Sequence, residues 1–182
     1  MNLFFKNNLI NIDLIIKKTG IKKNSKVADL GCGSLALFVF KLAEIVEDGT
    51  VYAIDVLKTS LEEVERKAKL ENFKNIKTIW SNLEIFQATK LESSSIDAAF
   101  LINVLHQSEK KEGMLREINR ILKRNGKLTI VDWKDASLPF GPTSDKRIDI
   151  ELLKKQTQNA GFKIVEEFDA GDYHFGITFI TA

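Results

Sequence analysis

Apolar residues are grouped along the chain in two alternating patterns, short continuous runs and longer segments with apolar residues three or four positions apart. The longer spacing predicts helices over residues 7–19, 35–46, 57–71, 109–124 and 148–160. The short runs predict strands that end at Ala28 and cover residues 51–55, 76–80, 96–102, 127–133, 162–168 and 173–180. Such an alternation is typical of a doubly wound α/β sheet with helices on both faces.

Turn residues set the predicted ends of these elements. Gly20 follows the first helix, and Asn125-Gly126 is predicted to cap the C-terminus of the fourth. Residues 169–172, Asp-Ala-Gly-Asp, are predicted to join the last two strands as a hairpin. We expect residues 1–24, which hold the first helix, to pack on the sheet or to cap the substrate site.

Composition favours an ordinary globular protein. The chain has 182 residues, 44% of them hydrophobic and 29% charged, which suits one domain over residues 1–182. No apolar stretch approaches the roughly 20 residues of a membrane span, and the first residues do not resemble a signal peptide, so a cytoplasmic protein is predicted. The single cysteine, Cys32, excludes an internal disulfide and a cysteine-rich metal cluster, and no metal site is predicted.

The charge pattern does not favour nucleic acid as a partner. A net charge of +2 implies no strong electrostatic field for a polyanion. Basic residues do cluster locally, within residues 17–26 and 116–127. We interpret both clusters as solvated helix ends, with RNA contact as the alternative.

The segment with the clearest chemistry is KVADLGCGSLAL, residues 26–37, in which Asp29, Gly31 and Gly33 lie between a strand and a helix. The glycines let a ligand lie against the backbone, and N–H groups at a helix start attract its negative end. The segment formally fits the dinucleotide pattern G-x-G-x-x-A. Asp29, however, would repel a pyrophosphate, whereas it can accept hydrogen bonds from an ammonium group. A ligand with an amino and a carboxylate end, such as S-adenosylmethionine, therefore fits better.

The same segment resembles a known family. VADLGCGSLA is similar to the first motif of class I S-adenosylmethionine-dependent methyltransferases, and VYAIDV, residues 51–56, resembles their second strand. That strand ends in the acid that holds the ribose hydroxyls, here Asp55, and Val56 follows it. The chain departs at Leu35, where the family commonly has a third glycine and where a side chain can narrow the turn. Residues 138–147, LPFGPTSDKR, resemble the loop after strand five in the ubiquinone- and menaquinone-biosynthesis-like branch, which has a methyltransferase type 11 or 31 domain.

The resemblance implies a Rossmann-like, seven-stranded sheet with an antiparallel last strand, and S-adenosylmethionine as the cofactor. Asn82 stands where the family usually has the Asp that reads the adenine amino group, and Leu83 is available to pack on the adenine. IDAAFLINVLHQ resembles the family's fourth-strand motif, which implies a contact of Asn103 with the methionine part of the cofactor. The predicted cofactor-binding residues are Asp29, Gly31, Cys32, Gly33, Asp55, Val56, Asn82, Leu83 and Asn103.

His106 is the candidate catalytic residue, because imidazole can take up a proton near neutral pH and the residue follows the fourth strand. A helix cap or packing residue is the alternative. Asp132, Trp133 and Lys134 come at the end of the fifth strand and are candidates for lining an acceptor pocket. His174 begins the last strand and either reaches that pocket or packs in the core.

The predicted activity is methyl transfer to a small-molecule acceptor, in which the protein mainly aligns donor and acceptor. The N-terminal helix and the loop of residues 139–147 are expected to enclose that acceptor. Three alternatives stay open: an RNA or protein methyltransferase, a nicotinamide-dependent oxidoreductase, and a non-enzymatic protein that binds S-adenosylmethionine.

Overall fold

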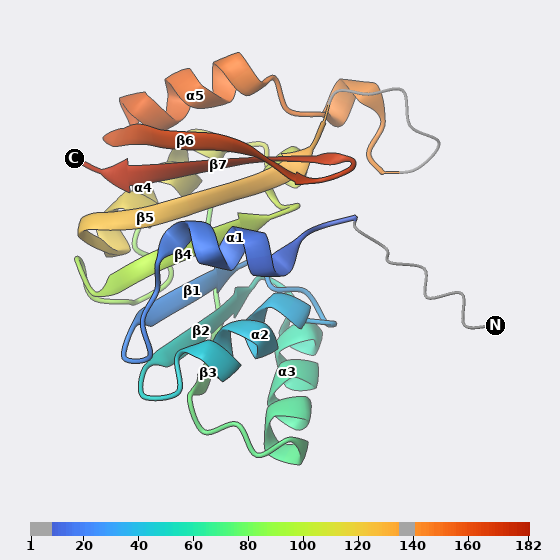
Figure 1. Cartoon of the computed structure of the whole chain (residues 1–182), viewed down its shortest axis with the longest axis vertical. Helices are drawn as coiled ribbons and strands as arrows, with labels where there is room; N and C mark the ends of the chain where they lie inside the picture. The colour runs from blue at the N-terminus through green and yellow to red at the C-terminus, as the bar shows by residue number, and fades with distance from the viewer. Residues whose placement is uncertain (1–8, 135–140) are drawn as a thin grey trace.

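The computed structural model describes residues 9–134 and 141–182, which form one seven-stranded sheet with helices packed on it (Figure 1). The strands are β1 (Lys26–Leu30), β2 (Thr50–Asp55), β3 (Ile76–Trp80), β4 (Ile96–Ile102), β5 (Leu122–Trp133), β6 (Phe162–Gly171) and β7 (His174–Thr181). The α-helices are α1 (Ile12–Thr19), α2 (Leu37–Ile45), α3 (Lys58–Leu70), α4 (Lys111–Ile121) and α5 (Ile150–Asn159). Two 3₁₀ turns, η1 (Leu105–Gln107) and η2 (Ser144–Lys146), complete the described elements.

The sheet has the strand order β3-β2-β1-β4-β5-β7-β6. The first five strands pair in parallel, and β7 is antiparallel to both of its neighbours, β5 and β6. The predicted doubly wound fold with an antiparallel last strand is therefore confirmed. The strand order reverses between β1 and β4, and a doubly wound sheet has its ligand crevice at the carboxyl ends of the strands beside such a point.

Two apolar clusters cover the two faces of the sheet. One joins residues of α1, α2 and α3 to the sheet, with Ile15, Val39 and Val64 among its buried members. The other joins α4 and α5 to the opposite face through Leu115, Ile118 and other buried side chains. Fully buried strands read as continuous apolar runs because both of their faces are covered, which is why β4 and β5 contain so few exposed positions. None of the described helices is long and apolar enough to cross a membrane.

The boundaries predicted from two turn signals are wrong. α4 ends at Ile121, not at residue 124, and Asn125-Gly126 is no helix cap, because β5 already begins at Leu122. The two residues lie instead in an irregular part of β5, where Asn125 takes a left-handed φ of +61°. Likewise, the predicted hairpin loop is too long, since β6 continues to Gly171. Ala170 is fully buried and its carbonyl accepts the N–H of Asn11 (2.7 Å), so tertiary contacts hold this segment in the sheet.

The helix at the N-terminus is shorter than predicted. The first two residues of the range 7–19 lie outside the described residues, and α1 begins at Ile12 because the side chain of Asn11 accepts the N–H of Leu14 (3.0 Å). The helix ends at Gly20 in the left-handed conformation, as predicted. It packs on the sheet beside β5, β6 and β7.

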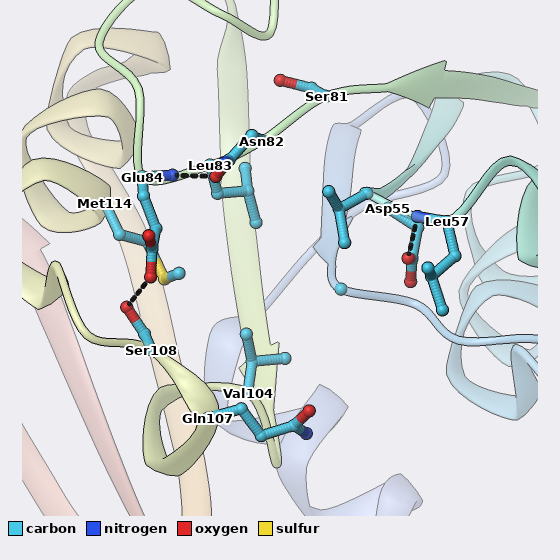
Figure 2. Close-up of a pocket in the computed structure, with 12 residues that line it drawn as sticks. Asp55, Leu57, Ser81, Asn82, Leu83, Glu84, Val104, Gln107, Ser108 and Met114 are labelled. Carbon is cyan, nitrogen blue, oxygen red and sulfur yellow. Dashed lines mark hydrogen bonds between the residues drawn. The ribbon is translucent and has the colours of Figure 1, made fainter.

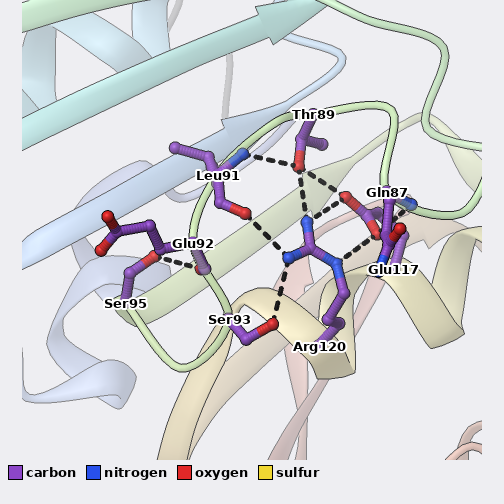
Figure 3. A network of polar contacts seen from close by, with 8 residues as sticks. All are labelled: Gln87, Thr89, Leu91, Glu92, Ser93, Ser95, Glu117 and Arg120. Carbon is purple, nitrogen blue, oxygen red and sulfur yellow. Dashed lines mark hydrogen bonds and ion pairs between the residues drawn. The ribbon is translucent and has the colours of Figure 1, made fainter.

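A buried ion pair fixes the long connection between β3 and β4 (Figure 3). Glu117 of α4 is fully buried and accepts hydrogen bonds from the N–H of Gln87 (2.8 Å), from the Thr89 hydroxyl and from Arg120. Arg120 in turn donates to the carbonyl of Leu91 (2.8 Å). A buried pair with every partner satisfied is costly to break, by about 3–5 kcal/mol, so the connection is held firmly on α4.

Candidate functional site

The glycine turn after β1 is held by backbone hydrogen bonds. The N–H groups of Gly31 and Cys32 both donate to the carbonyl of Ile54, at 2.7 and 3.1 Å. Gly31 has a φ of +81°, and a Cβ there would lie 2.6 Å from a methyl group of Val104. Gly33 has a φ of +63°, but a Cβ there would meet nothing within 4 Å. Gly31 is therefore required by packing, whereas the backbone at Gly33 faces open space that a ligand can approach.

The departure at Leu35 leaves this turn open. The Leu35 side chain is 75% exposed, so it does not fill the turn. The left-handed backbone conformation falls on the next residue, Ala36, whose φ is +44° and which precedes the first residue of α2. The missing third glycine is thus compatible with the observed path of the chain.

Two acidic side chains lie under the turn. The carboxylate of Asp55, at the end of β2, accepts the N–H of Gly33 (2.9 Å) with one oxygen and the N–H of Leu57 (2.8 Å) with the other. It therefore ties the glycine turn to the start of α3. Asp29 is 3% exposed and receives no donor among the hydrogen bonds of the described residues. Burial, and then the nearby charge of Asp55, raise the pKa of Asp29 to about 7.

A cavity of about 410 Å³ opens at the carboxyl ends of β1, β2, β3 and β4 (Figure 2). Its lining residues come from the glycine turn, the ends of β2 and β3, and the segments that follow β4. They are Gly31, Asp55, Val56, Leu57, Ser81, Asn82, Leu83, Glu84, Val104, Gln107, Ser108 and Met114. Five of the predicted cofactor residues, namely Gly31, Asp55, Val56, Asn82 and Leu83, are thus brought together around one cavity.

One wall of the cavity is the segment after β3. Its Asn82 oxygen accepts the N–H of Glu84 (2.9 Å), which bends the chain over the cavity. Glu84 accepts the hydroxyl of Ser108 (2.7 Å) and the N–H of Glu109 (3.1 Å), and the Ser108 hydrogen bond is the main cause of the lowered pKa of Glu84. Ser81 is 5% exposed, and its hydroxyl has no hydrogen-bond partner. A buried unpartnered hydroxyl beside a cavity is the kind of group that a bound ligand satisfies.

The other predicted site residues do not line this cavity. Asp29, Cys32 and Gly33 are not among its lining residues, although Cys32 and Gly33 belong to the same turn as Gly31. Burial raises the pKa of the Cys32 thiol, so it is protonated at neutral pH and unsuited to act as a nucleophile. Asn103 directly follows β4 with a φ of +57°, and its buried side-chain oxygen has no hydrogen-bond partner among the described residues.

His106 belongs to η1, and its side chain points toward Asp132 at the end of β5. Its Nδ1 is 2.8 Å from Oδ1 of Asp132, which is fully buried. The next residue, Trp133, packs its ring on that of His174, with 4.2 Å between the ring centroids. His174 Nδ1 is 2.7 Å from the carbonyl of Leu9, and its Nε2 is buried without a partner. Burial is the main cause of the lowered pKa of His174.

The loop after β5 is described only from Gly141, so the predicted loop residues 138–140 lie outside the described part of the chain. Gly141 lies against the Trp133 ring, where a Cβ would come within 2.9 Å of a ring carbon. Arg147 donates to the carbonyl of Lys134 (2.7 Å) and to that of Pro142 (3.1 Å). The described part of the loop therefore folds back on the end of β5.

Sequence reasoning missed much of the cavity wall, including Glu84, Ser108 and Met114, as well as the pairing of His106 with Asp132. The only available signal was topological, because side chains at the carboxyl ends of neighbouring strands meet at one edge of a sheet. β4 and β5 are neighbours, and both His106 and Asp132 come at or just after their ends.

Comparison with known proteins points to one family. A family model described as a methyltransferase domain matches residues 21–171. The 2-phytyl-1,4-naphtoquinone methyltransferase of Trichormus variabilis is 27% identical over 121 residues, which are 66% of this chain and 52% of the relative. The demethylmenaquinone methyltransferase of Lactococcus lactis is 29% identical over 126 residues, 69% of this chain and 48% of the relative. The chain thus spans about half the length of these curated relatives.

A solved structure agrees with the fold. The crystal structure of an S-adenosylmethionine-dependent methyltransferase from Aquifex aeolicus superposes with a TM-score of 0.87 at 24% sequence identity. The superposition covers 96% of this chain and 92% of that one. The similarity in fold therefore extends over nearly the whole chain.

Proposed function

The chain belongs to the methyltransferase domain family, and on that premise we propose that it transfers a methyl group from S-adenosylmethionine to a small-molecule acceptor. The observation that carries the proposal is the cavity at the carboxyl ends of β1 to β4, with Asp55 and the glycine turn on one side and Asn82 and Leu83 on another. S-adenosylmethionine supplies a methyl group that is already activated on its sulfonium centre. The task left to the chain is to bind and align the two reactants.

The cavity offers groups suited to each part of the cofactor. The Asp55 carboxylate can accept hydrogen bonds from ribose hydroxyls, since each oxygen has a further lone pair. Leu83 offers an apolar surface for the adenine ring, and the Asn82 oxygen and the Ser81 hydroxyl are polar groups within the same wall. Asp29 is close enough to Asp55 for that charge to raise its pKa, and it is the partner we assign to the amino group of the methionine part.

The acceptor is expected on the other side of η1, near the ends of β4 and β5. There His106, Trp133 and the described part of the loop after β5 lie close together. The Trp133 ring offers an apolar surface there, and His106 is a polar group beside it, which suits a small organic acceptor. The low net charge gives a nucleic acid no comparable support.

Calorimetric titration with S-adenosylmethionine and S-adenosylhomocysteine tests the proposal. Asp55→Asn removes a charged acceptor and should weaken both ligands by about 10- to 100-fold, the usual value of a hydrogen bond to a charged group. Asp97→Asn is the matched control. Asp97 also accepts a backbone N–H, that of Lys26 (2.7 Å), but at the opposite end of the sheet, so its replacement should leave both affinities unchanged.

Two outcomes would contradict the proposal. A folded wild-type chain that binds neither ligand would remove the cofactor assignment, and equal weakening in both variants would remove the site. The acceptor is then sought by measuring methyl transfer to a panel of small aromatic molecules and to an RNA transcript. Transfer to RNA that falls steeply with rising salt would favour the RNA methyltransferase over the small-molecule enzyme.

A further inference from the structure

The hydrogen bond between His106 and Asp132 fixes which ring nitrogen of His106 carries a proton. The Nδ1 atom is 2.8 Å from Oδ1 of Asp132, and a carboxylate oxygen only accepts. Nδ1 must therefore be the N–H donor. In the neutral imidazole the lone pair is then on Nε2, which is the atom that can take up a proton.

Asp132 is itself held by three donors. Besides Nδ1 of His106, its carboxylate accepts the backbone N–H of His106 (3.2 Å) and that of Trp133 (2.9 Å). The side chain is fully buried at the end of β5, so neither water nor rotation competes with these contacts. The imidazole is thus oriented by a rigid element of the sheet rather than by a loop.

His106 lies next to cavity-lining residues along the chain. Its neighbours along the chain, Val104, Gln107 and Ser108, line the cavity, whereas its own side chain faces Asp132 on the other side of η1. The side chain is 12% exposed, so the ring is not sealed in the core. His106 therefore lies on the boundary between the cofactor cavity and the groups around Trp133.

We propose that His106 is the catalytic base, that Asp132 is its positioning residue, and that the acceptor is consequently a hydroxyl compound methylated on oxygen. This inference rests on the proposed function. The acceptor oxygen forms a bond to the methyl carbon while the carbon–sulfur bond breaks and its electron pair goes to sulfur. The hydroxyl proton passes to Nε2 of His106, and the imidazolium that forms is stabilised by the Asp132 carboxylate before the proton is lost to water.

We infer the class of acceptor from how much a base accelerates attack by different nucleophiles. Among acceptors that attack through nitrogen, oxygen or sulfur, an ionised thiol has no proton to lose, and a neutral amine attacks with its own lone pair, so neither depends on a base during attack. A hydroxyl is a weak nucleophile until its proton leaves, and a positioned base typically contributes about 10²- to 10⁴-fold in rate. A histidine held in the basic tautomer beside the cavity is therefore most useful for a hydroxyl.

The first test needs no turnover. The chain has two histidines, so nitrogen NMR of the ¹⁵N-histidine-labelled protein gives two pairs of imidazole nitrogen signals, which His106→Gln and His174→Gln assign. At mildly alkaline pH we expect His106 as the Nδ1–H tautomer, and Asp132→Ala should shift its signals toward the Nε2–H form while those of His174 change less. A wild-type His106 in the Nε2–H tautomer overturns the proposal.

The second test separates base catalysis from structure. Methyl transfer is measured to catechol, a hydroxyl probe, and to 4-nitrothiophenol, which is ionised at neutral pH. His106→Gln should lower the rate with catechol by about 10²- to 10⁴-fold, and Asp132→Asn by a smaller factor, while the thiolate rate stays within a few-fold. Affinity for S-adenosylhomocysteine should stay at the wild-type value in both variants.

The outcomes distinguish this inference from the proposed function. Equal losses with both probes would mean that His106 only supports the fold, and wild-type transfer to the thiolate but not to catechol would exclude the hydroxyl acceptor. Either result overturns the inference and leaves the methyltransferase standing. Failure of the wild type to bind S-adenosylhomocysteine would instead remove the proposed function.

Discussion

The cavity half of the carboxyl edge, around β1, β2 and β3, and the half around β4, β5 and β7 are built in different ways. In the cavity half, backbone groups shape the glycine turn. Two glycines take left-handed conformations, and Asp55 accepts two backbone N–H groups. In the other half, side chains meet side chains, as His106 meets Asp132 and Trp133 packs on His174. A common ligand can be held by a local motif, whereas a selective site depends on which side chains the tertiary fold brings together.

The largest effect on the free energy of unfolding is expected from Asp29→Asn in the cavity half. A raised pKa of about 7 means that the native state holds the Asp29 proton more tightly than the unfolded chain does, so stability falls as the pH rises from about 4 through about 7. The neutral amide avoids that loss, and at about pH 8 the variant should be more stable by up to about 4 kcal/mol in urea denaturation. The gain should vanish below about pH 4.

The same variant should bind S-adenosylmethionine more weakly, because an amide replaces the carboxylate assigned to the ammonium group. A gain in stability with a loss of affinity would show that the acid is kept for binding. Identical pH profiles for wild type and variant would contradict the burial argument.

Gly31→Ala and Gly33→Ala are matched variants for which we expect an intermediate effect on the free energy of unfolding. At Gly31 the new Cβ would meet Val104 at 2.6 Å and the backbone is left-handed, so we expect a loss of about 2–4 kcal/mol in the free energy of unfolding. At Gly33 only the conformational cost applies, about 1–2 kcal/mol. Cofactor affinity should nevertheless fall in Gly33→Ala, since the added methyl group enters the open space of the turn. Equal stability losses would refute the distinction.

The smallest effect on the free energy of unfolding is expected from His174, in the half around β4, β5 and β7. Burial lowers its pKa, so the native state binds the proton less readily than the unfolded chain, and stability is lost as the pH falls below about 6.5. One proton contributes at most about 1.4 kcal/mol per pH unit. On acidification from about pH 7.5 to about pH 5.5, the wild type should lose more stability than His174→Gln. A parallel loss in both would assign the acid sensitivity to other groups.

The fold was largely predictable because its central strands, such as β1 and β4, are largely buried. β3 and β4 have the predicted bounds. β4 is a mostly apolar, buried run, whereas β3 is a half-buried edge strand whose ends are set by the turn residues around it. The errors arose where tertiary contacts override a local turn signal. Asn125-Gly126 signals a helix end but serves an irregularity within β5, and Ala170 is drawn into β6 by burial under the N-terminal segment.

The candidate site was predictable only where a motif carries it. Asp55 and the glycine turn were found because spacing along the chain reflects their geometry. Glu84 and Ser108 were not, because their hydrogen bond depends on the path of the β3–β4 connection, which the buried pair of Glu117 and Arg120 determines. No local pattern encodes where such a connection crosses the sheet edge.

The buried atoms without hydrogen-bond partners have a consequence for which substitutions selection favours at the carboxyl edge of the sheet. In the described chain, the buried side-chain atoms without a hydrogen bond are Ser81 Oγ, Asn103 Oδ1 and His174 Nε2, and each follows a strand end or begins a strand at the carboxyl edge of the parallel sheet. Each would cost the protein about 1–3 kcal/mol wherever neither water nor a ligand reaches it. A chain selected for stability alone would replace these three side chains early. Their presence marks the edge where selection for ligand contact competes with selection for stability.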